Sequence, residues 1–564
     1  MSDSEFETAL QAAVADEVRR ALGATLRPHE RQRHLMDRAR LVVRAYVWPR
    51  SAHAGDPELI AAARESVRAL RALQGPGGLF VGGDNVDSPP DSSFTVNDLC
   101  DALELIVRAP ADERAALADL EDELTAIADA IEPALLVGGV HTPNHRWEIS
   151  AALARLHRRR PSPALRDRAE QWLAEGIDIT PDGVYSERSA NYAAYVSNPS
   201  LTVIADVFDR ADAREAVIRN LESTLGLIHP DDSVETVHSR RQDQLNRFPL
   251  APYLVAYRRA AIDLDRGDFA WAAGRALEGG IPHPSAVLTE LLLAPRIGEE
   301  LPDAAPPAPQ RAWEQSGLVV DATAHRRLVV FGGSDYARFR RVRSGLSANP
   351  TFLRMFAGDV VLDSVRLSRD FFGLGPFRAD RFTPRSGERA PGYRLAETVS
   401  AHYYQPLDAD RRSPSGEYAL TDDGRFYGSM SFGDRATDDV SLHTVIDVEP
   451  TVDGAVVSIA IDGPDSPWAL ELAFRDGGVF EGVTEREDGT AVLDSGAGRY
   501  RVGSTAIAFD AGDDYRADGA GRYHPGEDYA FLGASDAAAG RRVYLTGRAP
   551  GRLVLTLHAE GTGE

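Results

Sequence analysis

The chain of 564 residues contains no lysine, so all 62 of its strongly basic side chains are arginines. A phosphate-binding loop of the Walker type and a lysine Schiff base both require a lysine amine, and the sequence therefore excludes both. The planar guanidinium group of arginine suits paired recognition of carboxylates. Since the net charge is −24, general attraction to nucleic acid or to an anionic membrane is not expected, and an anionic ligand needs a local basic patch.

Cysteine is nearly absent as well, since Cys100 is the only one. A single cysteine excludes an intramolecular disulfide and is typical of a reducing compartment. It lies in an apolar helical pattern, so we expect a buried side chain rather than a nucleophile. No run reaches the length of a membrane span and the first residues do not have the pattern of a signal peptide, so a soluble, cytoplasmic protein is expected.

Motifs for metals and cofactors are also missing. The sequence has no HExxH, CxxC, GxSxG or strand-linked GxGxxG pattern. We therefore expect cofactor-independent chemistry without a catalytic metal, and a structural divalent ion in the C-terminal half stays open. The sequence does not indicate an oligomeric state.

Two textures divide the chain. Residues 1–296 show apolar positions at three- and four-residue spacing, broken by Gly, Pro and Asp, which predicts about ten to twelve helices in a closed toroid or an open solenoid. The helical half shows no repeat of fixed length, which argues against the solenoid. Residues 297–315 are a proline-rich linker, and residues 316–564 alternate in short runs punctuated by DG and PG turns, which predicts a large antiparallel β-sandwich.

One loop interrupts the helical half at residues 75–100, where glycines and prolines precede SSFTVNDLC. We expect Ser92 or Ser93 to cap the helix that follows. Long ordered loops often line a ligand cleft, and the alternative is a plain surface connection.

The stretch from Thr142 to Tyr195 concentrates groups that can carry chemistry. It opens with Asn144, His145 and Arg146 at the start of a predicted helix. An asparagine there can be merely a helix cap, whereas a cap needs no imidazole. A histidine with its ordinary pKa of about 6.5 can move protons near neutral pH.

The same stretch ends in DGVYSERSANYAAY, with a predicted turn at Asp182-Gly183. Candidate residues here are Tyr185, Glu187, Tyr192 and Tyr195. The tyrosines can be ordinary packing residues, or one can be a proton donor and acceptor if neighbouring positive charge lowers its pKa.

A third element, HSRRQD, offers His238, Arg240 and Arg241. In an acidic chain this cluster is either a solvated surface or a site at which an arginine binds a substrate carboxylate.

Together these features resemble the heparinase II/III-type polysaccharide lyases: a multi-helix half, an Asn-His pair at a helix start, a DGxxxExSxxY segment and a proline-rich crossing into a β-sandwich. The resemblance implies an (α/α) toroid and cleavage of uronate glycans by β-elimination. It implies that Asn144 and His145 neutralise the uronate carboxylate and that Tyr192 is the acid and also the base, with Tyr195 in reserve. It also implies a histidine from the sandwich, for which His402 is the candidate.

The expected function is therefore a polysaccharide or oligosaccharide lyase acting on a uronate-containing glycan, exo-acting on imported oligosaccharides. Substrate-binding candidates are Arg240, Arg241, His238, Glu187, Tyr185 and Arg146. Two alternatives remain open: a glycoside hydrolase of the (α/α)-barrel type that uses Glu187 and Asp243 as its carboxylate pair, and a glycan-binding protein without turnover.

Overall fold

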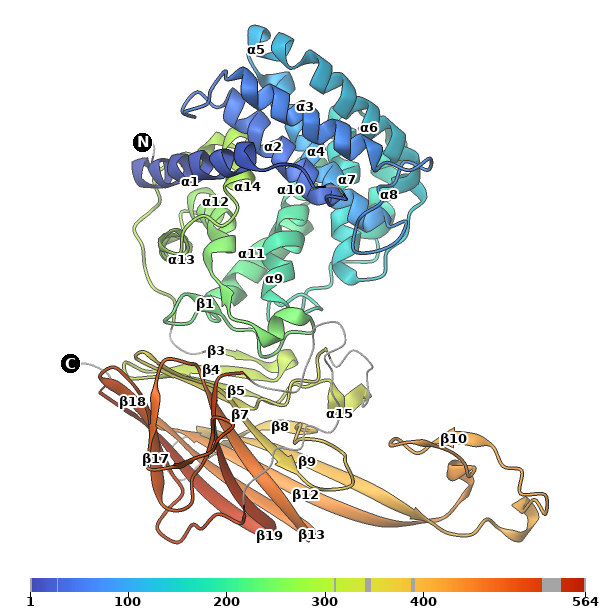
Figure 1. Ribbon diagram of the computed structural model, residues 1–564, viewed down its shortest axis with the longest axis vertical. Coiled ribbons are helices and arrows are strands. Elements are labelled where there is room, and N and C mark those ends of the chain that lie inside the picture. The colour runs from blue at the N-terminus through green and yellow to red at the C-terminus, as the bar shows by residue number, and fades with distance from the viewer. Residues whose placement is uncertain are drawn as a thin grey trace. The chain divides into compact units, whose positions relative to one another are not determined.

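The computed structural model describes residues 3–27, 29–308, 311–339, 346–386, 391–519 and 539–561. The chain forms two compact units (Figure 1). The first comprises Met1–Val234 and Phe248–Pro307, and the second comprises Glu235–Arg247 and Ala308–Glu564. The assignment of all residues 1–296 to one helical domain is thus wrong for 235–247. That segment is held in the second unit by ion pairs from Glu235 to Arg354 and from Arg240 to Asp335.

Helices build the first unit. Its twelve longer helices in the described residues are α1 (Ser4–Gly23), α2 (Gln32–Val47), α3 (Pro57–Ala72), α4 (Pro89–Arg108), α6 (Ala118–Val137), α7 (Pro143–Arg159), α8 (Pro163–Leu173), α10 (Asn198–Phe208), α11 (Ala211–Leu225), α12 (Leu254–Leu264), α13 (Gly267–Glu278) and α14 (Pro284–Leu293). Shorter elements are α5 (Ala111–Ala116), α9 (Ala190–Tyr192), a π-helix at Ala193–Ser197, and the paired strands β1 (Ser233–Val234) and β2 (Phe248–Pro249). The helix number predicted from periodicity is confirmed.

The longer helices pack as pairs in a closed ring. The pairs are α2 with α3, α4 with α6, α7 with α8, α10 with α11, α12 with α13, and α14 with α1, and α1 also contacts α2. One helix of each pair lines a central cavity: α2, α4, α7, α10, α12 and α14. A closed toroid, rather than an open solenoid, is therefore the architecture of this unit.

Local sequence signals explain where the helices begin. Asp3 and Asp56 cap α1 and α3 by accepting backbone N–H bonds, as short polar side chains do at helix starts. Helix α4 begins at Pro89 with Ser88 as its cap, so the cap expected at Ser92 or Ser93 is wrong. Proline at the first helical position is favourable because its missing N–H would have no partner there. Cys100 is buried in α4, and burial raises the pKa of its thiol to about 12.

Strands build the second unit. They are β3 (Arg311–Trp313), β4 (Leu318–Ala322), β5 (Arg327–Phe331), β6 (Leu353–Ala357), β7 (Val360–Arg369), β8 (Arg381–Ser386), β9 (Pro391–Tyr404), β10 (Leu420–Asp422), β11 (Tyr427–Ser429), β12 (Thr437–Pro450), β13 (Gly454–Phe474), β14 (Val479–Glu481), β15 (Thr484–Glu485), β16 (Thr490–Val492), β17 (Ala497–Val502), β18 (Thr505–Asp510) and β19 (Arg541–Glu560). A short helix, α15, covers Tyr336–Phe339.

The strands pair antiparallel throughout, apart from β16 with β19. The order is β14-β17-β18-β19-β13-β7-β6-β5-β4-β3, and β12, β9 and β8 branch from β13. Strand β13 pairs with β12 through its first half and with β7 through its second half. On its other edge it pairs with β19, with a register shift between Ile461 and Ser466. Alternate residues of these strands enclose one core, which includes Leu353, Leu367, Leu395, Leu442 and Leu470. The predicted antiparallel β-sandwich is confirmed.

Figure 1 shows β9 and β12 as long strands that extend to the separate β10–β11 hairpin, which lies between them in the sequence. In the part of the chain that the structure describes, no helix combines the length and the apolar character that a membrane crossing requires.

Candidate functional site

The start of α7 carries the Asn-His pair. Thr142 occupies the cap position without a side-chain cap bond, and Asn144 does not cap the helix either. Instead the Asn144 Nδ2 donates to Glu187 Oε2 at 2.6 Å. Asn144 is 1% exposed and His145 is 7% exposed, and the His145 ring makes an edge contact with His141. The interpretation of Asn144 as a plain helix cap is therefore wrong.

The contact between Asn144 and Glu187 joins two motifs that lie 43 residues apart in the sequence. The Oδ1 of Asn144 is buried and accepts no hydrogen bond from any described residue. An amide in this state keeps acceptor capacity for a group that donates a proton or a hydrogen bond. The geometry thus holds a polar group of the first motif against a carboxylate of the second.

The turn before Glu187 needs a glycine. Gly183 has a φ of +78°, and a Cβ at this position would lie 2.4 Å from the backbone oxygen of Arg219. Two residues later Tyr185 is buried, and its hydroxyl donates to Asn198 Oδ1 at 2.9 Å. Burial raises the pKa of Tyr185 well above its ordinary value. This tyrosine therefore lies in the core of the toroid and is a poor source of protons near neutral pH.

Two residues before Tyr192 shape the backbone that leads to it. Arg188 has a φ of +52°, a conformation uncommon for residues other than glycine, and Ser189 accepts the backbone N–H of Tyr192 at 3.1 Å. The Tyr192 side chain is half-buried. Directly after it the helix widens into the π-turn at Ala193–Ser197, a distortion that is frequent at functional sites.

Tyr195 lies within this π-turn and is 39% exposed. Its ring makes edge contacts with His283 at 5.2 Å and with Phe248 at 6.2 Å between ring centroids. Partial burial raises the pKa of its hydroxyl. The two tyrosine candidates therefore differ in surroundings, and Tyr195 borders the central cavity.

Arg146 points to a different set of partners. Its guanidinium forms ion pairs with Glu175 at 3.1 Å and with Asp178 at 3.5 Å, and it lies over the ring of Trp147. These contacts connect α7 with the segment after α8. The structure thus places Arg146 in a structural ion-pair cluster.

The HSRRQD segment lies in the second unit. Arg240 donates to both carboxylate oxygens of Asp335, at 2.6 and 2.9 Å, so its charge is compensated within that unit. His238 is buried and Arg241 is half-buried. Asp243 accepts a short hydrogen bond from the Ser239 hydroxyl. Glu187 and Asp243, the example of a carboxylate pair for the hydrolase alternative, belong to different units.

His402 lies near the end of β9, opposite Asp439 on β12. Its Nδ1 is 2.7 Å from Asp439 Oδ1, and this hydrogen bond lowers the pKa of the Asp439 carboxyl. The neighbouring Tyr404 packs on Phe432 and Tyr403 is exposed. A carboxylate at this position orients the imidazole ring.

The ring of inner helices encloses a cavity of about 330 Å³. Its rim includes the exposed residues Tyr195, Pro282 and His283, and buried residues such as Asn97 and Glu148 form its depth. This volume is at the lower end of the range of small-molecule sites, roughly 300–1,000 Å³.

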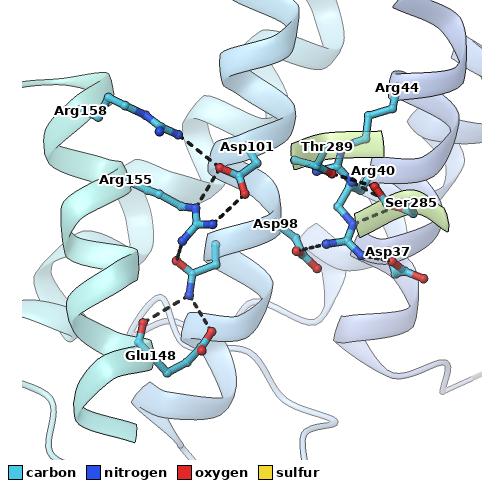
Figure 2. Close-up of polar contacts among 11 residues, drawn as sticks. Asp37, Arg40, Arg44, Asp98, Asp101, Glu148, Arg155, Arg158, Ser285 and Thr289 are labelled. Carbon is cyan, nitrogen blue, oxygen red and sulfur yellow. Dashed lines mark hydrogen bonds and ion pairs between the residues drawn. The ribbon is translucent and has the colours of Figure 1, made fainter. Parts of the chain in front are cut away.

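A buried polar network borders the cavity (Figure 2). Arg155 of α7 donates from Nε and Nη2 to the two carboxylate oxygens of Asp101 on α4, at 2.8 and 2.9 Å. Its Nη1 donates to Asn97 Oδ1 at 3.0 Å. Asn97 Nδ2 in turn donates to Glu148 Oε1 at 2.6 Å, and the Ser200 hydroxyl donates to Glu148 Oε2 at 3.0 Å.

The pKa values of the two carboxyl groups in this network, Glu148 and Asp101, are shifted in opposite directions. Burial raises the pKa of Glu148 to about 7, although the bond from Asn97 and the charge of Arg155 oppose this change. Burial also acts on Asp101, but its contacts with Arg155 outweigh burial and lower its pKa. Acid and base groups whose pKa values diverge are characteristic of functional sites and also of structural ion-pair networks.

Sequence reasoning missed this cavity. Only part of the loop stretch 75–100 belongs to it, through Phe94, Asn97 and Asp98 of α4. A signal was present, because Asp98 and Asp101 interrupt an apolar helix at a spacing of three residues and Glu148 and Arg155 repeat at seven. Such spacings place the charged residues on one face of the helix, where apolar core residues would otherwise be expected.

No group of three or more His, Cys, Asp or Glu side chains arranged for a metal ion occurs among the residues described.

The sequence matches no protein-family model, and no curated protein sequence matches it. Solved structures with a similar fold include the chondroitin AC lyase of Streptomyces coelicolor A3 in complex with chondroitin sulphate (14% identity, TM-score 0.55, covering 100% of this chain and 80% of that chain). A mutant of the heparan sulfate lyase HepC from Pedobacter heparinus follows at 10% identity and a TM-score of 0.52, covering 94% of this chain and 76% of that chain. A heparinase III with methylated lysines has 11% identity and a TM-score of 0.52, covering 94% and 77%. The chain therefore has the fold of the heparinase-type and chondroitinase-type polysaccharide lyases, a helical toroid followed along the sequence by an antiparallel β-sandwich.

Proposed function

We propose that this protein is a polysaccharide lyase that cleaves a uronate-containing glycan by β-elimination. The observation that carries the proposal is the hydrogen bond from Asn144 to Glu187, which unites the Asn-His motif with the segment that bears Tyr192 in a toroid of the lyase fold. The lyases of similar fold act on chondroitin and heparan sulphates, and a glycan with a uronate carboxylate is the corresponding substrate class here.

The reaction moves one proton and breaks two bonds of the uronate. A base removes the proton from C5, the C4–O bond to the leaving sugar breaks, and a C4–C5 double bond forms. The leaving oxygen takes a proton from an acid, and no water is consumed. Loss of the C5 proton is feasible when polar groups stabilise the charge that develops on the carboxylate. Asn144, through the second N–H of its amide, and His145 have this role in the proposal, and Tyr192 is the acid and the base.

The remaining candidates have supporting parts in the proposal. Glu187 orients the Asn144 amide, and Tyr195 is the reserve proton donor. Arg240, Arg241, His238 and His402 belong to the second unit and stay sequence-based candidates for binding or proton transfer. We further propose that the substrate is an imported oligosaccharide cleaved from one end. Endo-type product ladders from long polymers would contradict this exo-action.

Product chemistry tests the proposal directly. The full chain is incubated with a panel of uronate-containing glycans, and ultraviolet absorbance reports the unsaturated uronate. A lyase produces this chromophore and incorporates no oxygen from isotopically labelled water. Incorporation of the label would instead identify a hydrolase, and binding without either product would identify a glycan-binding protein.

The Tyr192→Phe variant locates the proton donor. We expect turnover to fall by about 10²–10⁴-fold, the usual contribution of general acid–base catalysis, while glycan binding is nearly retained. Tyr257→Phe is the matched control, because it also removes one tyrosine hydroxyl, here a structural donor to the Leu221 backbone oxygen. Full activity of Tyr192→Phe would transfer the role to Tyr195.

The Asn144→Ala variant tests charge stabilisation. We expect kcat to fall by about 10²–10³-fold with a smaller change in KM, as for removal of one oxyanion-type donor, roughly 2.7–4 kcal/mol. A change confined to KM would show that Asn144 only binds the substrate.

A further inference from the structure

The charged groups around the central cavity are unevenly compensated. Four arginines line it, and each is in direct contact with an aspartate: Arg33 with Asp91, Arg40 with Asp98, Arg155 with Asp101, and Arg259 with Asp206. The charge of each of these arginines is therefore balanced by an aspartate in direct contact with it. They provide no free cation for an anionic ligand in the cavity.

Two lining carboxyl groups have no such counterion. Glu148, which is 4% exposed, accepts hydrogen bonds from the neutral groups of Asn97 and Ser200. No ion pair to it occurs among the described residues, and the positive charges of Arg155 and Arg33 act on it without such a contact. The Glu290 side chain of α14 forms no hydrogen bond or ion pair among the described residues, and the charges of Arg155 and Arg259 act on it without direct contact. The two cavity groups without an ion pair are thus carboxyl groups, whose oxygens are hydrogen-bond acceptors, and burial raises the pKa of both.

The other walls suit a ring with one apolar face. Phe94 and Tyr195 supply aromatic surfaces, and Thr202 and Thr289 supply hydroxyls. Carboxyl groups accept charge-assisted hydrogen bonds from hydroxyls, whereas a second anion in the same low-dielectric space is repelled. A uronate or sulphated ring therefore fits the electrostatics poorly.

We propose that the central cavity of the toroid is a binding pocket for an uncharged, hydroxyl-rich sugar ring, held by Glu148 and Glu290 and stacked on Tyr195. The Phe94 ring is part of the wall and carries the Arg33 guanidinium at 3.8 Å from its centroid. The pocket is distinct in chemistry from the carboxylate-recognising groups Asn144 and His145. Sugar binding in this pocket is measured without turnover. A negative binding result therefore contradicts only the pocket, and a negative lyase assay contradicts only the proposed function.

The test is a binding titration of the full chain with D-glucose, D-galactose, N-acetyl-D-glucosamine and D-glucuronate, measured by calorimetry and ligand-observed NMR. At least one neutral sugar is expected to bind. Thr202→Phe fills the cavity and is expected to weaken that binding about tenfold or more. Val203→Phe is the matched control, because Val203 is the next residue of α10, is also half-buried and does not line the cavity. It is expected to bind as the unmodified protein does.

Glu290→Gln provides a second variant of nearly unchanged shape. It replaces a charge-assisted acceptor with a neutral one, and we expect neutral-sugar affinity to fall several-fold. Glucuronate binding that survives Thr202→Phe belongs to another site and agrees with the proposal.

Three results would overturn it. The first is that no neutral sugar binds. The second is that folded Thr202→Phe binds neutral sugars as tightly as the unmodified protein. The third is that glucuronate binds as tightly as the neutral sugars and that Thr202→Phe abolishes this glucuronate binding. If circular dichroism shows that Thr202→Phe does not fold, unchanged neutral-sugar affinity in Glu290→Gln overturns it instead.

Discussion

The buried Glu148 carboxyl makes a quantitative prediction about stability. It lies on α7 among the inner helices, where burial raises its pKa from the ordinary 4.5 to about 7. Above pH 7 the folded protein must hold this group ionised with two neutral donors and no direct counterion. Replacing Glu148 by glutamine removes the charge and keeps the shape, and the amide oxygen can still accept the Asn97 N–H.

The raised pKa fixes the sign and the size of the effect. A group that is a weaker acid in the folded state contributes stability below pH 4.5, and this contribution is lost as the pH rises to about 7. At about 1.4 kcal/mol for each tenfold change in acidity constant, the full loss is roughly 3 kcal/mol. Glu148→Gln should therefore stabilise the helical unit by up to about that amount at pH 8 and hardly at all near pH 4.

Urea unfolding followed by far-ultraviolet circular dichroism measures this, because the helices of the first unit dominate the signal. Both proteins are unfolded at several pH values between 4 and 8. Glu215→Gln, at an exposed position of α11, is the control for a carboxyl-to-amide change without burial and should leave stability nearly constant. Destabilisation by Glu148→Gln at pH 8, or a gain that does not change with pH, would refute the reasoning.

Two further substitutions test other parts of the toroid. Asp101→Asn should destabilise it by about 3–5 kcal/mol near neutral pH, because it leaves the buried Arg155 without its counterion; a loss below 1 kcal/mol in urea unfolding would contradict this. The penalty should shrink in acid, since the lowered pKa of Asp101 gives stability that disappears as the pH falls through it. Gly183→Ala should cost about 1–3 kcal/mol for its left-handed backbone and more for the clash with the Arg219 oxygen, whereas Gly176→Ala has a similar φ in open space. Equal thermal shifts for both glycine variants would show that the clash is relieved at no cost.

Much of the candidate site was visible in the sequence because it depends on local order. Asn144 and His145 mark the start of a helix, and the Asp182-Gly183 turn precedes Glu187. The structure adds the contact between Asn144 and Glu187, which ended the interpretation of Asn144 as a cap. It also sets Tyr185 apart, because its hydroxyl donates to the buried Asn198.

Other assignments failed because they depend on which distant residues meet. Nothing in HSRRQD indicates that Arg240 pairs with Asp335, 95 residues away, and so belongs with the second unit. The aspartates of α4 likewise look like solvated charges until α7 is placed opposite them and Arg155 reaches Asp101.

The sequence by itself determined the secondary structure, the helical and β-rich halves and the residue types available for chemistry. Periodicity of three to four or of two residues specifies which face of a helix or strand is buried, and this is a local property. Only the tertiary structure decided that six inner helices line a cavity and that Glu148 and Glu290 lie there with arginine charges nearby but without an ion pair among the described residues. The partner of a buried charge depends on the packing of distant elements, and that packing sets both the pKa of Glu148 and the ligands that the cavity can accept.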